Sequence, residues 1–295
     1  MIRRGLRPPV FVPRPYVRPT APGVTVVECA SVARAAPAPA ATHVPHVVIP
    51  AAPPAVPTQR QPEEGRPMPR KRHDQMTPDE WSDFLDAFEA LHTLDAPFPR
   101  HLDFLEVHLR VFDGARGWHR GRPHFLAWYR HLLHRFERAL QEVRRGVFIP
   151  YWDVYADPAI PDALDDPRRL ERWRVTRHFR AHDMPSREEI DVVRAQKRFS
   201  TFERLVELVV HESVLAAVGG ADARGCAGTL ASAMATLDPL FWCHLANLDR
   251  LWVEFQTRLP AEVPRYVRET LEPAPLFGVQ VQTVLSTTAL GYGYA

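Results

Sequence analysis

The sequence is poor in cysteine. Three cysteines in 295 residues, Cys29, Cys226 and Cys243, lie far apart and lack the paired spacing of a zinc site. A small and odd number of cysteines is typical of a reducing compartment, so no disulfide framework is expected. This composition predicts a cytoplasmic protein.

Long apolar runs, basic runs and internal repeats are absent as well. No apolar stretch reaches the 18 residues that a membrane-spanning helix requires. The arginines are scattered and the net charge is +2, so the pattern of a nucleic-acid-binding surface is missing. Arg3 and Arg4 are basic, but Pro8 and Pro9 interrupt any apolar segment of an export signal. Neither a membrane nor a nucleic acid is therefore expected as a partner.

Proline is plentiful, and its distribution divides the chain. More than half of the 30 prolines lie in the first 70 residues, mixed with alanine and valine. Such a segment cannot form long helices and favours extended conformations, with short strands possible at 24–27 and 47–49. The sequence predicts an extended or disordered arm over 1–75, a helical core over 76–270 and a tail over 271–295. Whether the arm is loosely attached, wraps the core or docks a protein partner stays open.

Beyond the arm, apolar residues recur at helical spacing. Thr77, Pro78 and Glu80 form the pattern of a capping box at the start of the first helix. Asp238 followed by Pro239 predicts another helix start. The fold class is mainly α, a bundle of four principal helices with long irregular connections and few short strands. The main helical segments lie at about 78–91, 102–111, 123–146, 201–218 and 238–252, with a further helix at 186–196.

Histidines gather on these helices. Bundles build transition-metal sites from imidazoles on facing helices, although spacing alone does not separate such a site from ordinary surface or core histidines. His131 and His134 lie off the apolar stripe and are expected to face solvent. His178 and His182 have i,i+4 spacing without a further ligand pattern. The histidines on or next to core helices are His108, His119, His124, His131, His134, His211 and His244.

Several motifs, in the right order over residues 76–295, resemble those of the tyrosinase family. His119 with residues 125–130 is similar to the first copper motif, and residues 238–244 with 249–252 are similar to the second. Residues 150–153 resemble the family's Tyr-Trp-Asp element. Residues 218–220 resemble its glycine loop, and the end of the chain resembles its tyrosine-bearing tail. The resemblance implies a tyrosinase-like four-helix bundle.

Tyrosinases and catechol oxidases hold two coppers, each bound by three histidines, and oxidise phenols or catechols to quinones. The resemblance places His108 and His119 at ligand positions of the first copper, while the third position falls on Tyr129. For the second copper, His211 occupies one position. The other two fall on Leu215 and Leu245, the latter directly after His244.

Three of six ligand positions therefore lack histidine, and a leucine has no lone pair to offer a metal. The expected cofactor is none, or copper that does not form a dinuclear pair. Tyr129, Leu215, His244 and Leu245 are expected to line the pocket.

Two carboxylates accompany these positions. Glu207 fits the place of the family's water-orienting glutamate, with a helix-surface carboxylate as the alternative. Glu212 stands directly after His211 and is a candidate orienting partner for its imidazole.

Four functions follow as hypotheses. The first is a copper-depleted enzyme acting on a small phenolic or aromatic metabolite of secondary metabolism, with Tyr129, His211, Glu207 and Glu212 in acid–base roles. Its reaction would be a cyclisation, hydration or isomerisation. The second is a single metal held by His108, His119 and His211. The third is a non-catalytic scaffold that binds a protein through the arm, and the fourth is phenol or catechol oxidation with atypical coordination.

Overall fold

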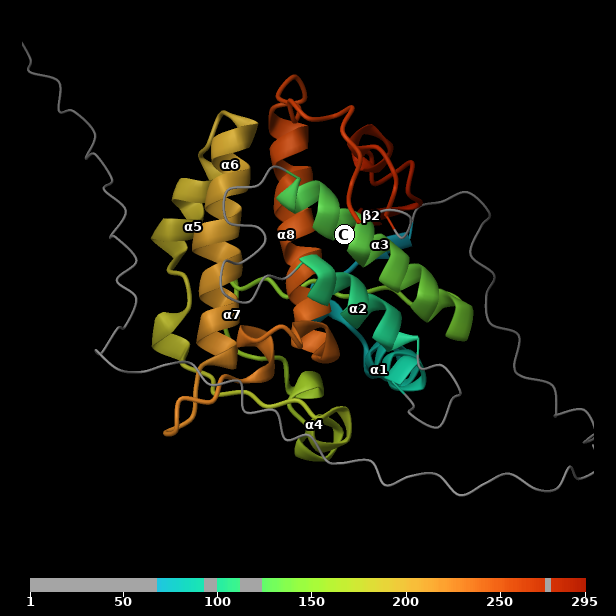
Figure 1. Cartoon of the computed structure of the whole chain (residues 1–295), viewed down its shortest axis with the longest axis vertical. Helices are drawn as coiled ribbons and strands as arrows, with labels where there is room; N and C mark the ends of the chain where they lie inside the picture. The colour runs from blue at the N-terminus through green and yellow to red at the C-terminus, as the bar shows by residue number, and fades with distance from the viewer. Residues whose placement is uncertain (1–67, 93–99, 112–123, 274–276) are drawn as a thin grey trace, which may run out of the picture.

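The computed structural model describes residues 68–92, 100–111, 124–273 and 277–295. The predicted fold class is confirmed, since helices dominate the described residues and strands are short (Figure 1). The α-helices are α1 Pro78–His92, α2 His101–Val111, α3 Phe125–Val143, α4 Pro167–Trp173, α5 Arg187–Arg194, α6 Phe199–Leu205, α7 Glu212–Gly219 and α8 Pro239–Arg258. The strands are β1 Met68–Arg70 and β2 Tyr292–Tyr294.

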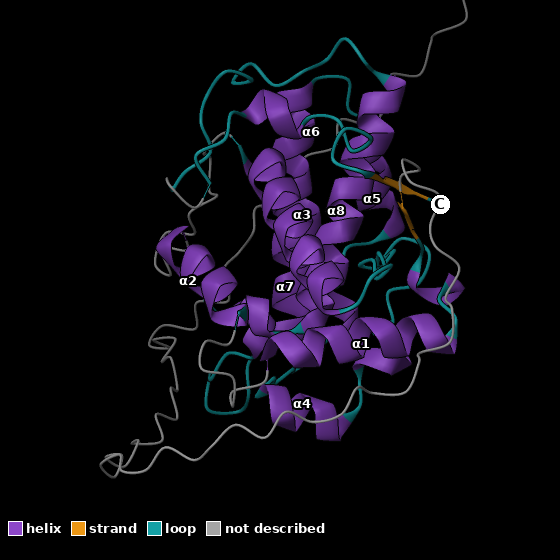
Figure 2. Cartoon of the chain, turned by 90° about the vertical axis from the view of Figure 1, so that its right-hand side faces the viewer, coloured by secondary structure: helices purple, strands orange, loops and turns teal. Residues whose placement is uncertain are grey.

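Helix α8 lies at the centre of the molecule. Almost every residue from Pro239 to Trp252 is buried, as expected for a helix covered on all sides. Helix α3 packs against α8, and α6 and α7 run end to end along its other side (Figure 1). Helix α1 crosses near one end of these helices and packs on α3 (Figure 2). The bundle therefore brings α3, α6–α7 and α8 together around one interior.

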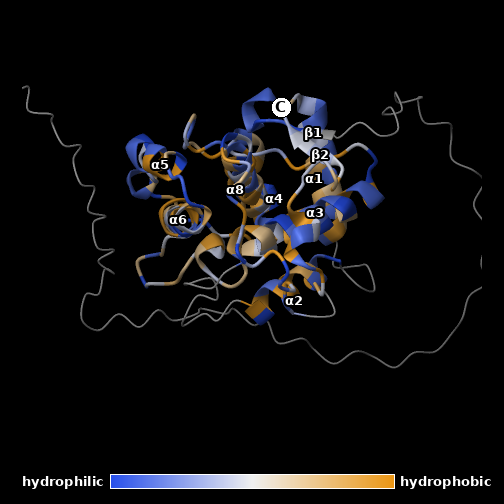
Figure 3. Ribbon diagram, turned by 90° about the horizontal axis from the view of Figure 1, so that it is seen from above, coloured by the Kyte–Doolittle hydropathy of each residue, from blue (hydrophilic) through white to orange (hydrophobic). Residues whose placement is uncertain are grey.

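Aromatic rings fill this interior. Phe136 of α3 stacks on Trp242 of α8 with ring centroids 3.6 Å apart, and Phe104 of α2 meets both rings edge-on. The outer helices are amphipathic. In α5, Ile190 and Val193 are buried while hydrophilic residues lie on the outer side (Figure 3).

The predicted helix starts are confirmed. The Thr77 amide donates to the Glu80 carboxylate at 2.9 Å, and the Glu80 amide donates to the Thr77 hydroxyl at 3.2 Å. The Asp238 carboxylate accepts from the Leu240 amide at 2.8 Å. The prediction of a single regular helix over 201–218 is wrong in one respect. A π-helical turn, Val206–His211, separates α6 from α7.

The prediction that His131 and His134 face solvent is wrong. Both rings are half-buried because the C-terminal tail covers this side of α3. The His131 ring meets Phe277 at 4.8 Å, and the His134 ring stacks on Tyr292 at 6.2 Å. The tail lies about 150 residues further along the chain, so the periodicity of α3 alone could not predict that it covers these two rings.

The two strands join the first described residues and the C-terminal residues to the core. Strands β1 and β2 pair in parallel, with Arg70 opposite Tyr294. The arm was predicted to extend to residue 75, but residues 68–75 belong to the folded part of the chain. Residues 1–67, which hold the rest of the predicted arm with its suggested strands and docking role, lie outside the described residues.

Beside the strands, six polar side chains form a buried cluster, here called the anchor cluster. The Arg70 guanidinium donates to Glu137 of α3 at 2.9 Å and to Asp249 of α8 at 3.2 Å. The Asp249 carboxylate also accepts from Arg130 and from the two tyrosines of β2. The cluster thereby joins β1, α3, α8 and β2. Its members are Arg70, Arg130, Glu137, Asp249, Tyr292 and Tyr294.

A bilayer-spanning segment would have to be both long and apolar. Among the described helices, none meets both conditions.

Candidate functional site

Two histidines and a tyrosine from three different elements meet inside the bundle. His211 ends the π-helical turn, His244 lies on α8 and Tyr129 lies on α3. The imidazoles of His211 and His244 are nearly parallel with centroids 5.3 Å apart, and Nδ1 of His211 lies 3.2 Å from Nε2 of His244. The Tyr129 ring lies 5.2 Å from the His211 ring. We call these three residues the His-Tyr site.

The walls of the His-Tyr site are aromatic and apolar. The Phe125 ring meets both Tyr129 and His211 edge-on, at 5.2 and 5.3 Å. The Phe241 ring lies 6.1 Å from Tyr129 and 5.5 Å from His108 of α2. The site is therefore a nearly dry interior in which polar groups depend on one another for hydrogen bonds.

The π-helical turn determines which side chains enter this interior. Such turns widen a helix by one residue and are frequent at functional sites. Here the turn contains both Glu207 and His211, which are 2% and 4% exposed. The alternative that Glu207 is a helix-surface carboxylate is thus excluded. Arg204, one turn earlier, pairs with the Glu207 carboxylate at 3.5 Å.

Burial keeps the His244 and His108 imidazoles neutral. It lowers the pKa of His244 to about 3 and that of His108 to about 4, the latter against a hydrogen bond to the Ala233 carbonyl. Burial raises the pKa of Tyr129 well above its ordinary range, and the nearby charge of Glu207 adds to this. At neutral pH the Tyr129 phenol consequently keeps its proton and can donate it in a hydrogen bond.

The tautomer of His108 follows from its partner. Nδ1 of His108 lies 3.2 Å from the Ala233 carbonyl oxygen. Because a carbonyl only accepts, Nδ1 of the neutral ring carries the hydrogen and Nε2 does not. This is the orientation that a backbone carbonyl gives to a metal-ligating histidine.

The remaining predicted site residues differ in how deeply they are buried and in what they contact. Leu245 is buried, Leu215 is half-buried and packs against the core, and Glu212 is half-buried at the start of α7. Nδ1 of His211, for which Glu212 was the predicted partner, lies against His244. His119 lies outside the described residues.

The described donors do not assemble a metal site. Across residues 68–92, 100–111, 124–273 and 277–295, no group of three or more His, Cys, Asp or Glu is placed to hold a metal ion. Tyr129, Leu215 and Leu245 stand at ligand positions implied by the resemblance, and two of them have no donor atom. At these three positions the described chain offers a copper ion no imidazole.

One polar pair was missed from the sequence. The Glu203 carboxylate of α6 accepts from the Tyr266 hydroxyl at 2.5 Å and from the Leu126 amide at 3.1 Å. It thereby caps the first turn of α3, the helix that carries Tyr129. Burial raises the pKa of Glu203 to about 7, although both hydrogen bonds oppose this shift. The only hint in the sequence was its position four residues before Glu207.

Known proteins resemble this chain over most of its described part. The family model for the common central domain of tyrosinase matches residues 86–171 and 162–258, together more than half of the chain. A tyrosinase from Streptomyces lincolnensis is 29% identical over 247 residues, 66% of this chain and 85% of that protein. A tyrosinase from Streptomyces glaucescens is 31% identical over 192 residues, 50% of this chain and 67% of that protein.

Solved structures share the fold. A functional unit of octopus hemocyanin superposes with a TM-score of 0.63 at 21% identity, covering 77% of this chain and 68% of that one. A polyphenol oxidase from Grenache (Vitis vinifera) superposes with a TM-score of 0.56 at 18% identity, covering 86% of this chain and 94% of that one. With the family model and the Streptomyces relatives, these likenesses lead to one conclusion: the chain belongs to the tyrosinase family.

Proposed function

We propose that this tyrosinase-family protein does not use a copper pair and instead performs acid–base chemistry on a small phenolic or aromatic metabolite. The observation that carries the proposal is the buried His211–His244 hydrogen bond with the Tyr129 ring packed beside it. This arrangement supplies proton donors and acceptors at a site where three of the family's six ligand positions lack an imidazole.

The side chains at two ligand positions of the second copper, Leu215 and Leu245, disfavour binding of that ion. Leu245 is 1% exposed and packs within the core, Leu215 packs at its edge, and neither side chain has a donor atom for a metal. Of this ion's three ligand positions only that of His211 keeps an imidazole, and one imidazole holds a metal weakly. No step of the proposed chemistry therefore passes through a metal.

The hydrogen bond determines where His211 can act. Its Nδ1 is engaged by His244, so proton exchange with a ligand would take place at Nε2. The Tyr129 hydroxyl would donate a hydrogen bond to a substrate oxygen, and the Phe125 and Phe241 rings would contact a flat ring. Glu207, buried nearby, would stabilise a positive charge that develops on His211. A cyclisation, hydration or isomerisation needs only such proton transfers.

Binding of phenol by chelator-treated protein tests this proposal. We expect calorimetry to detect phenol binding in the presence of EDTA. His211→Gln and Tyr129→Phe should each weaken it about tenfold or more, as loss of a buried hydrogen bond predicts. His182→Gln is the matched control, because the His182 side chain is 80% exposed, in the short 3-10 helix Ala181–Asp183. Phenol binding that requires added copper, or that survives both site variants, would refute the proposal.

One observation favours a second function, oxidation of phenols with atypical coordination. The Ala233 carbonyl orients His108 with Nε2 unprotonated, as a metal ligand requires. Oxygen uptake with catechol distinguishes the two functions. A protein that consumes oxygen after copper loading, and stops when the metal is chelated, would support this alternative over the first.

A further inference from the structure

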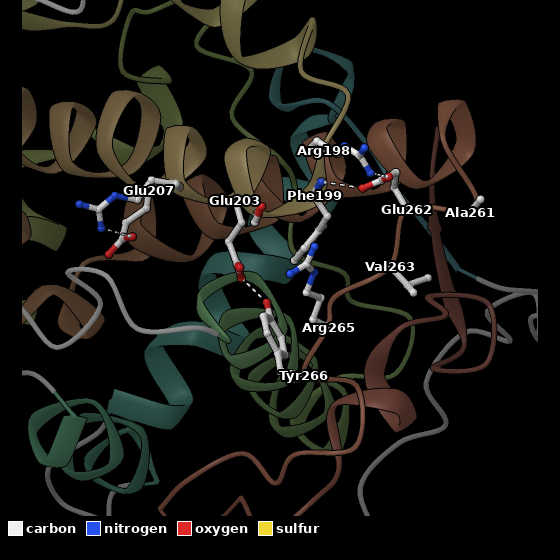
Figure 4. Close-up of a pocket in the computed structure, with 11 residues that line it drawn as sticks. Arg198, Phe199, Glu203, Glu207, Ala261, Glu262, Val263, Arg265 and Tyr266 are labelled. Atoms are coloured by element: carbon white, nitrogen blue, oxygen red, sulfur yellow. Dashed lines mark hydrogen bonds and ion pairs between the residues drawn. The ribbon is translucent and has the colours of Figure 1, made fainter.

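An open cavity of about 470 Å³ lies next to the His-Tyr site, between α6 and the segment that follows α8 (Figure 4). Its volume falls in the range of small-molecule sites, roughly 300–1,000 Å³. Glu207 lines the cavity, and its charge also acts on Tyr129. None of His211, His244 and Tyr129 lines it, so the cavity is separate from the His-Tyr site.

Three arginines line the cavity, and two of them are paired. Arg198 binds the Glu262 carboxylate at 2.9 Å, and Arg204 binds that of Glu207 at 3.5 Å. The third, Arg265, forms no ion pair or hydrogen bond with any other described residue. Figure 4 shows its side chain extending toward Phe199 and Glu203.

The remaining carboxyl does not neutralise Arg265 fully. Glu203 is 7% exposed and is held by the Tyr266 hydroxyl and the Leu126 amide. Its pKa is raised to about 7 by burial, so near neutral pH it carries only part of a negative charge. The cavity therefore presents a net positive charge at one place, on the guanidinium of Arg265.

Apolar surface lies beside this charge. The cavity is lined by the ring of Phe199, the ring of Tyr266 and the side chain of Val263, which is 54% exposed. Val263 offers a flat molecule exposed apolar surface to cover, and the largely buried rings of Phe199 and Tyr266, 3% and 8% exposed, line the same cavity. A guanidinium binds a carboxylate through two parallel hydrogen bonds.

We propose that this cavity binds a small aromatic carboxylate, with the carboxylate on Arg265 and the ring against Phe199 and Val263. The proposal does not depend on the chemistry at His211 or on any metal. It adds a second ligand site to the molecule, on the outer side of Glu207.

Calorimetric titration of the full chain with benzoate tests the proposal. Benzamide has the same shape without the charge, and acetate has the charge without the ring. We expect benzoate to bind at least about tenfold more tightly than either. Arg265→Ala should weaken benzoate binding by a similar factor. Arg268→Ala is the matched control, because Arg268 is an exposed arginine three residues away that does not line the cavity.

Three results would overturn the proposal: no binding at millimolar benzoate, equal binding of benzamide, or equal losses for the two arginine variants. Repeating the titration with His211→Gln separates this site from the His-Tyr site. Benzoate affinity should stay unchanged in that variant, whereas a loss would place the ligand at His211 and refute the cavity assignment.

Discussion

Removing the charge of Asp249 should destabilise the protein more than any exposed carboxylate does. Asp249 accepts from Arg70 and Arg130, whose side chains are fully buried, and from the Tyr292 and Tyr294 hydroxyls. Asp249→Asn keeps the shape of the side chain and an oxygen for the tyrosines, so it isolates the effect of the charge. Arg70 retains Glu137, but Arg130 loses the only carboxylate with which it forms an ion pair among the described residues.

The expected loss in unfolding free energy follows from the burial of the Asp249 ion pairs. Breaking a buried ion pair by neutralising one partner costs about 3–5 kcal/mol, because an uncompensated charge remains inside the protein. Urea denaturation at pH 7 should show a loss of this size for Asp249→Asn. The control is Asp74→Asn. Asp74 pairs with Arg72 at the surface, where such a pair contributes less than about 1 kcal/mol.

The pH dependence gives a second check. Burial alone would raise the pKa of Asp249, but the charges of Arg130 and Arg70 outweigh it and hold the pKa below 3.8, its ordinary value. A lowered pKa stabilises the folded state above pH 3.8, and this stabilisation is lost as the pH falls through the folded-state pKa. The difference between wild type and variant should therefore shrink only below about pH 4. A loss under 1 kcal/mol at pH 7 would refute the role given to the anchor cluster.

Two further predictions concern buried groups outside the His-Tyr site. Burial lowers the pKa of His92 to about 3, and the stacked ring of His101 adds to this. The folded state should be fully stable with respect to this group above pH 6.5 and should lose stability as the pH falls toward 3. His92→Phe should therefore flatten the decline in melting temperature over this range. An unchanged decline would contradict the assignment. Burial likewise raises the pKa of the Cys243 thiol above its ordinary range, so iodoacetamide should label Cys243 only in urea, as read from its peptide mass, and labelling of the native protein would be inconsistent with a buried thiol.

The helices were largely predictable because their starts are encoded locally. The capping box at Thr77 and the Asp238–Pro239 start of α8 each depend on residues within one turn, and both form as expected. The π-helical turn was not predicted, since it leaves the apolar spacing almost helical. The burial of His131 and His134 depends on a distant tail.

The candidate site was partly predictable. Tyr129 and His244 were both expected to line the pocket, and both are buried in the helical core. The contact between His211 and His244 could not be foreseen, as it depends on how α8 lies beside the π-helical turn. The cavity at Arg265 was missed for a similar reason. Its residues come from α6 and from a loop some 60 positions later, and neither segment carries a motif.

The central claim, that lost ligands rather than a changed fold prevent copper pairing, is tested most directly by restoring them. Elemental analysis should compare copper in the wild-type protein with copper in the triple variant Tyr129→His/Leu215→His/Leu245→His, both loaded and dialysed identically. We expect two coppers per chain in the triple variant and no bound pair in the wild type. Two coppers in the wild-type protein would contradict the account.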